Sequence, residues 1–193
     1  MTGGAVTVAP RLAAPRPLIT SAAAGGASAL LALAAHSALD TSGYSWLLTV
    51  LLAAAAAVPV AIDIRIRKLP NRWVAPIAVA GAVQAIAVAY ASADVWRFLW
   101  PLIAAAIVFA FYGALGLAGM FGLGDAKFAA ALTITVAIYA GPFALYLIPI
   151  AMVLGAVYRL GLQLSGQSSG PRAHGPAIAV AGVSVLLLAV VFG

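Results

Sequence analysis

The chain has 193 residues, of which 65% are hydrophobic and 7% are charged, and its mean hydropathy is +1.15. This composition excludes a soluble globular domain and indicates an all-α, polytopic membrane protein, because a transmembrane barrel needs alternating polar and apolar residues that these apolar runs lack. The net charge of +6 is better explained by basic loops that set membrane orientation than by a nucleic-acid partner, so we expect no nucleic acid and a lipid bilayer as the surroundings.

The N-terminal segment is rich in Gly, Pro and Ala. Residues 1–17 are therefore predicted to be a disordered cytoplasmic tail, and residues 18–193 a single transmembrane helical domain. The first apolar stretch, Leu18–Leu39, follows Arg11 and Arg16 and so has the outline of a signal peptide. We interpret it as a retained helix, because the apolar stretch is long and no clear small-residue cleavage site follows it.

Further apolar stretches follow, and with the first they predict about seven membrane-spanning helices. They are Tyr44–Ile62, Trp73–Ala91, Phe98–Met120, Ala126–Ala140, Pro142–Leu162 and Ala177–Phe192. The dipeptide Gly141-Pro142 is the reason for dividing the long apolar run after Asp125 into two helices.

The basic residues predict how the helices cross the membrane. Every Lys and Arg except Arg97 lies in the tail, in a loop or at an adjoining helix end on the same predicted side. The positive-inside rule places that side in the cytoplasm, and an odd number of spans then places the C-terminus outside the plasma membrane. Asp63 and Asp125 fall on the cytoplasmic side, whereas Asp40 and Asp94 fall outside.

The chain has no Glu, and two of its Asp residues stand where a long apolar run meets a basic or glycine-rich loop. A carboxylate is costly at such a place, so Asp63 and Asp125 are candidates for function. If the second and fifth predicted helices pack together, the two carboxyls meet and share a proton. The ionised carboxyl could then take a proton from water while the protonated one hydrogen-bonds to a scissile carbonyl. Either Asp alone is as readily an interfacial residue or a helix cap.

Five residues near the two carboxyls are predicted to support them. Gly122 and Gly124 permit unusual backbone conformations and leave space for a substrate backbone to approach. Lys127 either influences the local charge or reaches to the membrane surface. Pro70 and Asn71 mark the end of an irregular loop and the start of the third predicted helix.

The sequence predicts no metal centre and no cofactor. It has no Cys, which excludes a disulfide, a thiolate metal site and a cysteine nucleophile. The histidines His36 and His174 are far apart in sequence, which makes a zinc site improbable.

The two Asp motifs together resemble those of the prepilin peptidases, or type IV leader peptidases, which are intramembrane aspartic proteases of the Gly-x-Gly-Asp class. The matching strings are Asp63 followed by Leu69-Pro70-Asn71, and then Gly122-Leu123-Gly124-Asp125 with Lys127. A further string, His174-Gly175-Pro176, looks like the family's Gly-Pro signature. The resemblance covers about residues 45–192. It implies a six-helix core with an extra N-terminal span, and Asp63 and Asp125 as the catalytic pair.

The resemblance also implies an activity and partners. The chain would be an aspartic-type endopeptidase that cleaves the leader of prepilin or pseudopilin substrates at the cytoplasmic face, usually just after a Gly. Full-length members add a cysteine-based zinc domain and methylate the new N-terminus. The lack of Cys here indicates a short, peptidase-only form, similar to those serving Flp-type pili. The natural substrate, the pilus or secretion system, any N-methylation and the oligomeric state stay open.

Two alternatives remain at this stage. Relatives of presenilin share the Gly-x-Gly-Asp string but place a Tyr directly before their first Asp, where this chain has Ile62. The alternative from another class is a non-catalytic membrane transporter or a pilus or secretion assembly protein, although the chain shows no internal repeat and no ionisable residue in mid-span. Convergence of Asp63 and Asp125 would distinguish a protease from a transporter.

Overall fold

The computed structural model describes residues 41–66, 69–165 and 174–192, and within these ranges the regular structure is helical. The elements are α2 (Thr41–Ile66), α3 (Asn71–Ser92), α4 (Trp96–Leu117), α5 (Leu123–Ala140), the 3-10 helix η1 (Gly141–Tyr146), α6 (Leu147–Leu164) and α7 (Gly175–Phe192). The predicted tail and the predicted first span lie outside the described residues.

Three stretches of the described chain are long and apolar enough to cross a membrane, namely Asn71–Ser92, Trp96–Leu117 and Leu123–Leu164. They identify a multi-pass membrane protein. A shorter apolar helix covers Gly175–Ala189. The predicted number of about seven spans stays a prediction.

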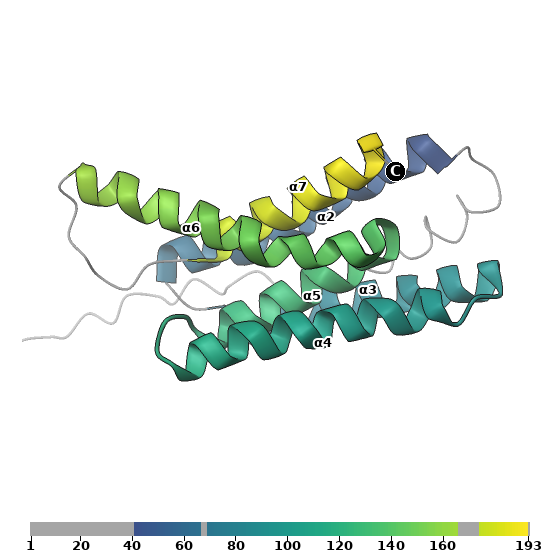
Figure 1. Ribbon diagram of the computed structural model, residues 1–193, viewed down its shortest axis with the longest axis horizontal. Helices are drawn as coiled ribbons and strands as arrows, with labels where there is room; N and C mark the ends of the chain where they lie inside the picture. Colours follow the sequence, from purple (N-terminus) through teal and green to yellow (C-terminus); the bar gives the residue numbers. More distant parts are fainter. Residues whose placement is uncertain (1–40, 67–68, 166–173, 193) are drawn as a thin grey trace, which may run out of the picture.

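The third stretch is not one continuous helix. α5 ends at Ala140, and Gly141 has a φ of 53°, a backbone conformation that favours glycine. Pro142 lies in η1, so α6 begins at Leu147 and not at Pro142 as the sequence predicted. The predicted break therefore falls at the right place, and the chain reverses there so that α6 leads back alongside the bundle (Figure 1).

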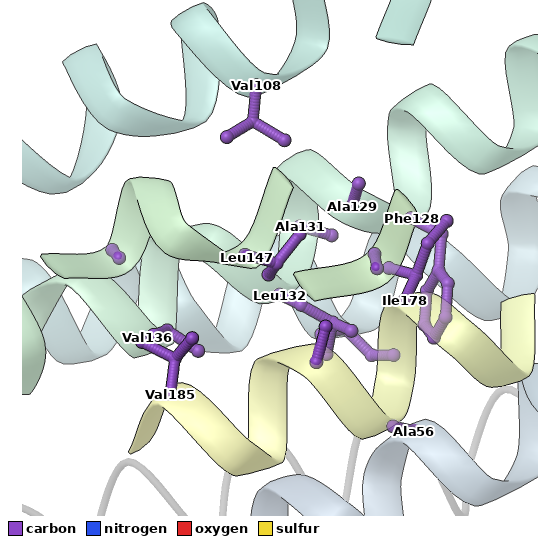
Figure 2. Close-up of a cluster of buried hydrophobic side chains, with 14 of the residues drawn as sticks. Ala56, Val108, Phe128, Ala129, Ala131, Leu132, Val136, Leu147, Ile178 and Val185 are labelled. Carbon is purple, nitrogen blue, oxygen red and sulfur yellow. The ribbon is translucent and has the colours of Figure 1, made fainter. Parts of the chain in front are cut away.

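The core lies around α5, which packs against α3 and α4 on one side and against α7 on the other (Figure 1). Figure 2 shows Val136 of α5 beside Val185 of α7, and Val108 of α4 on the other side of α5. Small residues allow the close approach: a Cβ added to Gly81 of α3 would lie 3.0 Å from Cγ2 of Ile134. α5 is thus held from several sides and can position a side chain at its first turn.

The alternation of helix directions brings six helix ends to one end of the bundle. These are the C-terminal ends of α2, α4 and α6 and the N-terminal ends of α3, α5 and α7 (Figure 1). The turn between α3 and α4, which contains Asp94, lies at the opposite end. The two candidate Asp residues therefore share one end of the molecule although they are far apart in sequence.

Candidate active site

Asp63 lies near the end of α2 and is only 4% exposed. Its Oδ2 atom accepts a hydrogen bond of 2.9 Å from the backbone N–H of Gly175, the first residue of α7. A Cβ added to Gly175 would lie 2.7 Å from the same oxygen, which is closer than real Cβ contacts come. The carboxylate and the start of α7 can therefore approach each other only because this residue is a glycine.

Asp125 lies in the first turn of α5, where its Oδ2 accepts a hydrogen bond of 3.0 Å from the backbone N–H of Gly122, the N-cap residue. A carboxylate there is stabilised by the helix dipole and by the unpaired N–H groups of the helix end. Helix capping therefore explains in part why residue 125 is an Asp. The bond occupies Oδ2 and leaves Oδ1 for another partner.

The carboxyl groups of Asp63 and Asp125 lie within range of an electrostatic interaction. α2 and α5 thus bring together the two Asp residues that the sequence singled out. Asp94 lies at the other end of the bundle, where it pairs with Arg97 at 3.7 Å. Asp40 lies outside the described residues.

In the part of the chain that the structure describes, no group of three or more His, Cys, Asp and Glu side chains gathers that could hold a metal ion.

The loop before α3 is fastened to the first turn of α5. Nζ of Lys127 donates a hydrogen bond of 3.0 Å to Oδ1 of Asn71. Pro70 is the N-cap residue of α3, and buried Leu69 packs against Gly124, where an added Cβ would lie 3.0 Å from Cβ of Leu69. These contacts set the position of α3 relative to α5.

Gly122 and Gly124 differ from expectation in two respects. Neither Gly122 nor Gly124 has a positive φ, so their conformational freedom is not used. The space beside Gly124 is occupied by Leu69 and is not open to a substrate backbone. The glycine at this position serves close packing of two chain segments, which the sequence alone could not distinguish from an open approach.

Three aromatic side chains form a cluster next to the glycines that bond to the two carboxyls, and reasoning from the sequence assigned no role to these rings. The ring centroids of Phe121 and His174 lie 4.4 Å apart, and those of Tyr112 lie 5.7 Å from Phe121 and 6.0 Å from His174. Tyr112 is fully buried and lies within electrostatic range of Asp125. No sequence signal marks Tyr112, because it is one of several aromatic residues in the apolar helix α4. The sequence did mark His174 as the first residue of the string that resembles the family's Gly-Pro signature, but it gave the imidazole no role.

Two polar atoms of this aromatic cluster are buried and have no hydrogen-bond partner among the described residues. They are Oη of Tyr112 and Nε2 of His174. Buried polar atoms are normally paired, so each of these two atoms is a candidate for contact with an ordered water molecule.

His174 is enclosed between the aromatic rings and α6. An added Cβ on Gly155 of α6 would overlap the imidazole, so the ring fits only against a glycine. Burial, together with the positive charge of Arg159, lowers the pKa of His174 to about 4, and the ring is therefore neutral near neutral pH. Beside it lies a cavity of about 180 Å³, lined by Leu154, Gly155, Tyr158, Arg159, His174, Pro176, Ala177 and Val180.

Comparison with known proteins gives one match. The sequence pattern of the type IV leader peptidase family, a family of proteases, matches residues 46–160, which include Asp63, Asp125 and the supporting loop before α3. No curated protein and no solved structure shows significant similarity to the chain. Since the match covers more than half of the sequence, the chain belongs to the type IV leader peptidase family.

Proposed function

We propose that this protein is an intramembrane aspartic endopeptidase that removes the leader of a prepilin or pseudopilin-like substrate. Asp63 and Asp125 form its catalytic pair. The observation that carries the proposal is the electrostatic interaction between these two carboxyls, which come from distant parts of a chain that belongs to a leader peptidase family.

The proposed mechanism divides the work between the two carboxyls. Two carboxyls that interact in a poorly solvated site titrate as a pair, and one stays protonated while the other is ionised. The ionised carboxylate takes a proton from water as the water oxygen attacks the scissile carbonyl carbon. The protonated carboxyl gives its proton to the carbonyl oxygen. Transfer of a proton to the amide nitrogen then lets the C–N bond break, and no acyl-enzyme forms.

The backbone hydrogen bonds support this division. Each carboxyl is held at Oδ2 by one glycine N–H, from Gly175 for Asp63 and from Gly122 for Asp125. A backbone N–H does not titrate near neutral pH, so it fixes the orientation of a carboxyl without gaining or losing a proton itself. Correct orientation of reacting groups supplies a large part of the rate enhancement of an enzyme.

The substrate is proposed to meet the pair at the cytoplasmic edge of the membrane. A helical peptide bond is shielded by the helix hydrogen bonds, so cleavage requires local unwinding, and a Gly at the cut makes unwinding cheap. The apolar segment beyond the cut stays in lipid beside the enzyme. A basic leader is attracted to anionic lipid by about 1 kcal/mol per residue.

The substrate experiment uses co-expression of the protein with each small pilin-like protein of the same organism, followed by intact-mass measurement of the N-termini. We expect a substrate to lose a short basic leader after a Gly with the wild type, and to stay full-length with the D63N/D125N double variant. Full-length products in both cases, for every candidate, would favour the alternative of a non-catalytic transporter or assembly protein.

A further inference from the structure

The two backbone anchors of the carboxyls are built in the same way. Gly122 precedes α5 and donates its N–H to Oδ2 of Asp125 at 3.0 Å. Gly175 begins α7 and donates its N–H to Oδ2 of Asp63 at 2.9 Å. The distance between the two carboxyls therefore depends on the distance between these two glycines.

Each of the two glycines directly follows an aromatic residue. Phe121 precedes Gly122, and His174 precedes Gly175. The two rings contact each other with centroids 4.4 Å apart and planes inclined by 36°. A displacement of one ring shifts the backbone to which the next glycine belongs, so the ring contact is coupled to both anchors.

We propose that Phe121 and His174 are positioning residues whose ring contact holds Asp63 and Asp125 at their working separation. This inference rests on the proposed function, because a fixed separation matters only if the two carboxyls act as a pair. The pair of rings acts through the glycines and does not itself touch the reacting atoms.

The surroundings of the rings favour a mechanical role. Tyr112 packs on both rings, and Gly155 of α6 leaves just enough space for the imidazole. Nε2 of His174 has no hydrogen-bond partner among the described residues, so no polar contact of that atom orients the ring. Packing against Phe121, Tyr112 and Gly155 constrains the position of the ring, and an aromatic residue without nitrogen could reproduce this packing.

The first measurement compares the kinetics of F121A, H174A and the double variant on a cleavable prepilin peptide. Misplacement of a catalytic group by about 1 Å costs on the order of 100-fold, so we expect each single variant to lose about 10-fold to 100-fold in kcat with little change in KM. The double variant should lose about as much as one single variant, because both substitutions break the same contact. Full multiplication of the two losses would overturn the inference.

Rescue variants separate packing from imidazole chemistry. F121Y and H174F restore an aromatic ring, and a cavity of about 180 Å³ lies beside His174. Both should recover most of the lost kcat. If H174F is as slow as H174A, the imidazole acts chemically and the proposed ring contact is overturned. These variants also answer the question if the alanine variants do not fold.

The pH dependence of kcat distinguishes a change in the separation of the carboxyls from a loss of stability alone. A greater separation weakens the repulsion between the carboxyls, so the two apparent pKa values of the pair move together and the bell-shaped profile narrows. Among the described residues, other titratable groups near the site are Tyr112 on α4, His174 before α7 and Arg159 on α6. Lower activity with an unchanged width would contradict the proposed role.

A matched control is Phe143 of η1, which stacks on Tyr146 at 6.1 Å and lies beyond the end of α5 opposite to Asp125. F143A should keep the wild-type kcat and profile. The D63N variant separates a failure of the positioning role from a failure of the proposed function. If D63N is inactive while F121A and H174A equal the wild type, the positioning role fails and the proposed function stands. If D63N is active, the proposed function itself fails.

Discussion

Gly175 and Gly182 lie on the same helix but differ in what surrounds them. A Cβ on Gly175 would lie 2.7 Å from Oδ2 of Asp63, whereas a Cβ on Gly182 would make ordinary contacts at 3.6 Å with Leu132 and Leu147. We therefore expect G175A to displace the carboxylate and to lower kcat by about 100-fold. G182A should cleave at the wild-type rate and serves as the matched control. Equal activity of the two variants would show that the Gly175 contact does not matter.

The buried imidazole of His174 predicts a dependence of stability on pH. Its pKa falls from 6.5 to about 4 on folding, mainly through burial, so between these values the unfolded chain binds more protons than the folded one. The contribution is present above the upper value and is lost as the pH falls toward the lower value. Thermal unfolding in detergent should therefore show a smaller loss of stability on acidification for H174F than for the wild type. Identical slopes would contradict the buried, neutral state of His174.

At the scale of single residues, the sequence was informative about polar side chains and silent about packing. Asp63 and Asp125 stood out because carboxylates are rare in this apolar chain. The ring contact of Phe121 with His174 could not be predicted, because it depends on how α7 meets the loop before α5. Contacts of this kind are properties of the tertiary structure and leave no local pattern.

At the scale of elements, the packing of α5 against the loop before α3 leads to a testable prediction. An Ala at Gly124 would bring its Cβ to 3.0 Å from Cβ and 3.2 Å from the carbonyl oxygen of Leu69, so the loop before α3 would have to move. Overpacking of this kind costs about 1–3 kcal/mol. We expect G124A to lower the melting temperature and the cleavage rate together.

Gly161 of α6 differs from Gly124 in having free space around it, since an added Cβ there would meet nothing within 4 Å. G161A should stabilise the protein by about 0.5–1 kcal/mol through helix propensity, with unchanged cleavage. A higher melting temperature for G124A than for G161A would contradict the packing described here.

Within the described residues, the helices could be located from apolar runs, but their full extent could not. α2 covers Thr41–Ile66, whereas the apolar run predicted Tyr44–Ile62, because hydropathy follows the solvent and a helix can continue into polar surroundings. The break at Gly141 was marked by Gly and Pro. The 3-10 helix that follows was not predicted, because a short segment with Pro near its start gives no periodic signal of its own.

At the scale of the whole molecule, one end of the bundle carries the candidate site and the other carries the turn between α3 and α4. The basic residues predict that the site end faces the cytoplasm. The native chain has no Cys, so single cysteines report topology cleanly. A membrane-impermeant thiol reagent applied to intact cells should label S92C and should leave K127C unlabelled until the membrane is opened. The reverse pattern would contradict the predicted orientation.

The central claim is that Asp63 and Asp125 together perform peptide hydrolysis. The direct measurement is the cleavage rate of a prepilin peptide by purified wild-type protein, D63N, D125N and D94N in lipid vesicles, with folding checked by thermal unfolding. An amide cannot share a proton or accept one from water in this role, so D63N and D125N should each lose about 100-fold to 10,000-fold in cleavage rate, the size of a general acid–base contribution. D94N, which changes a carboxylate at the opposite end, should match the wild type. A folded D63N or D125N that cleaves at the wild-type rate would contradict the account.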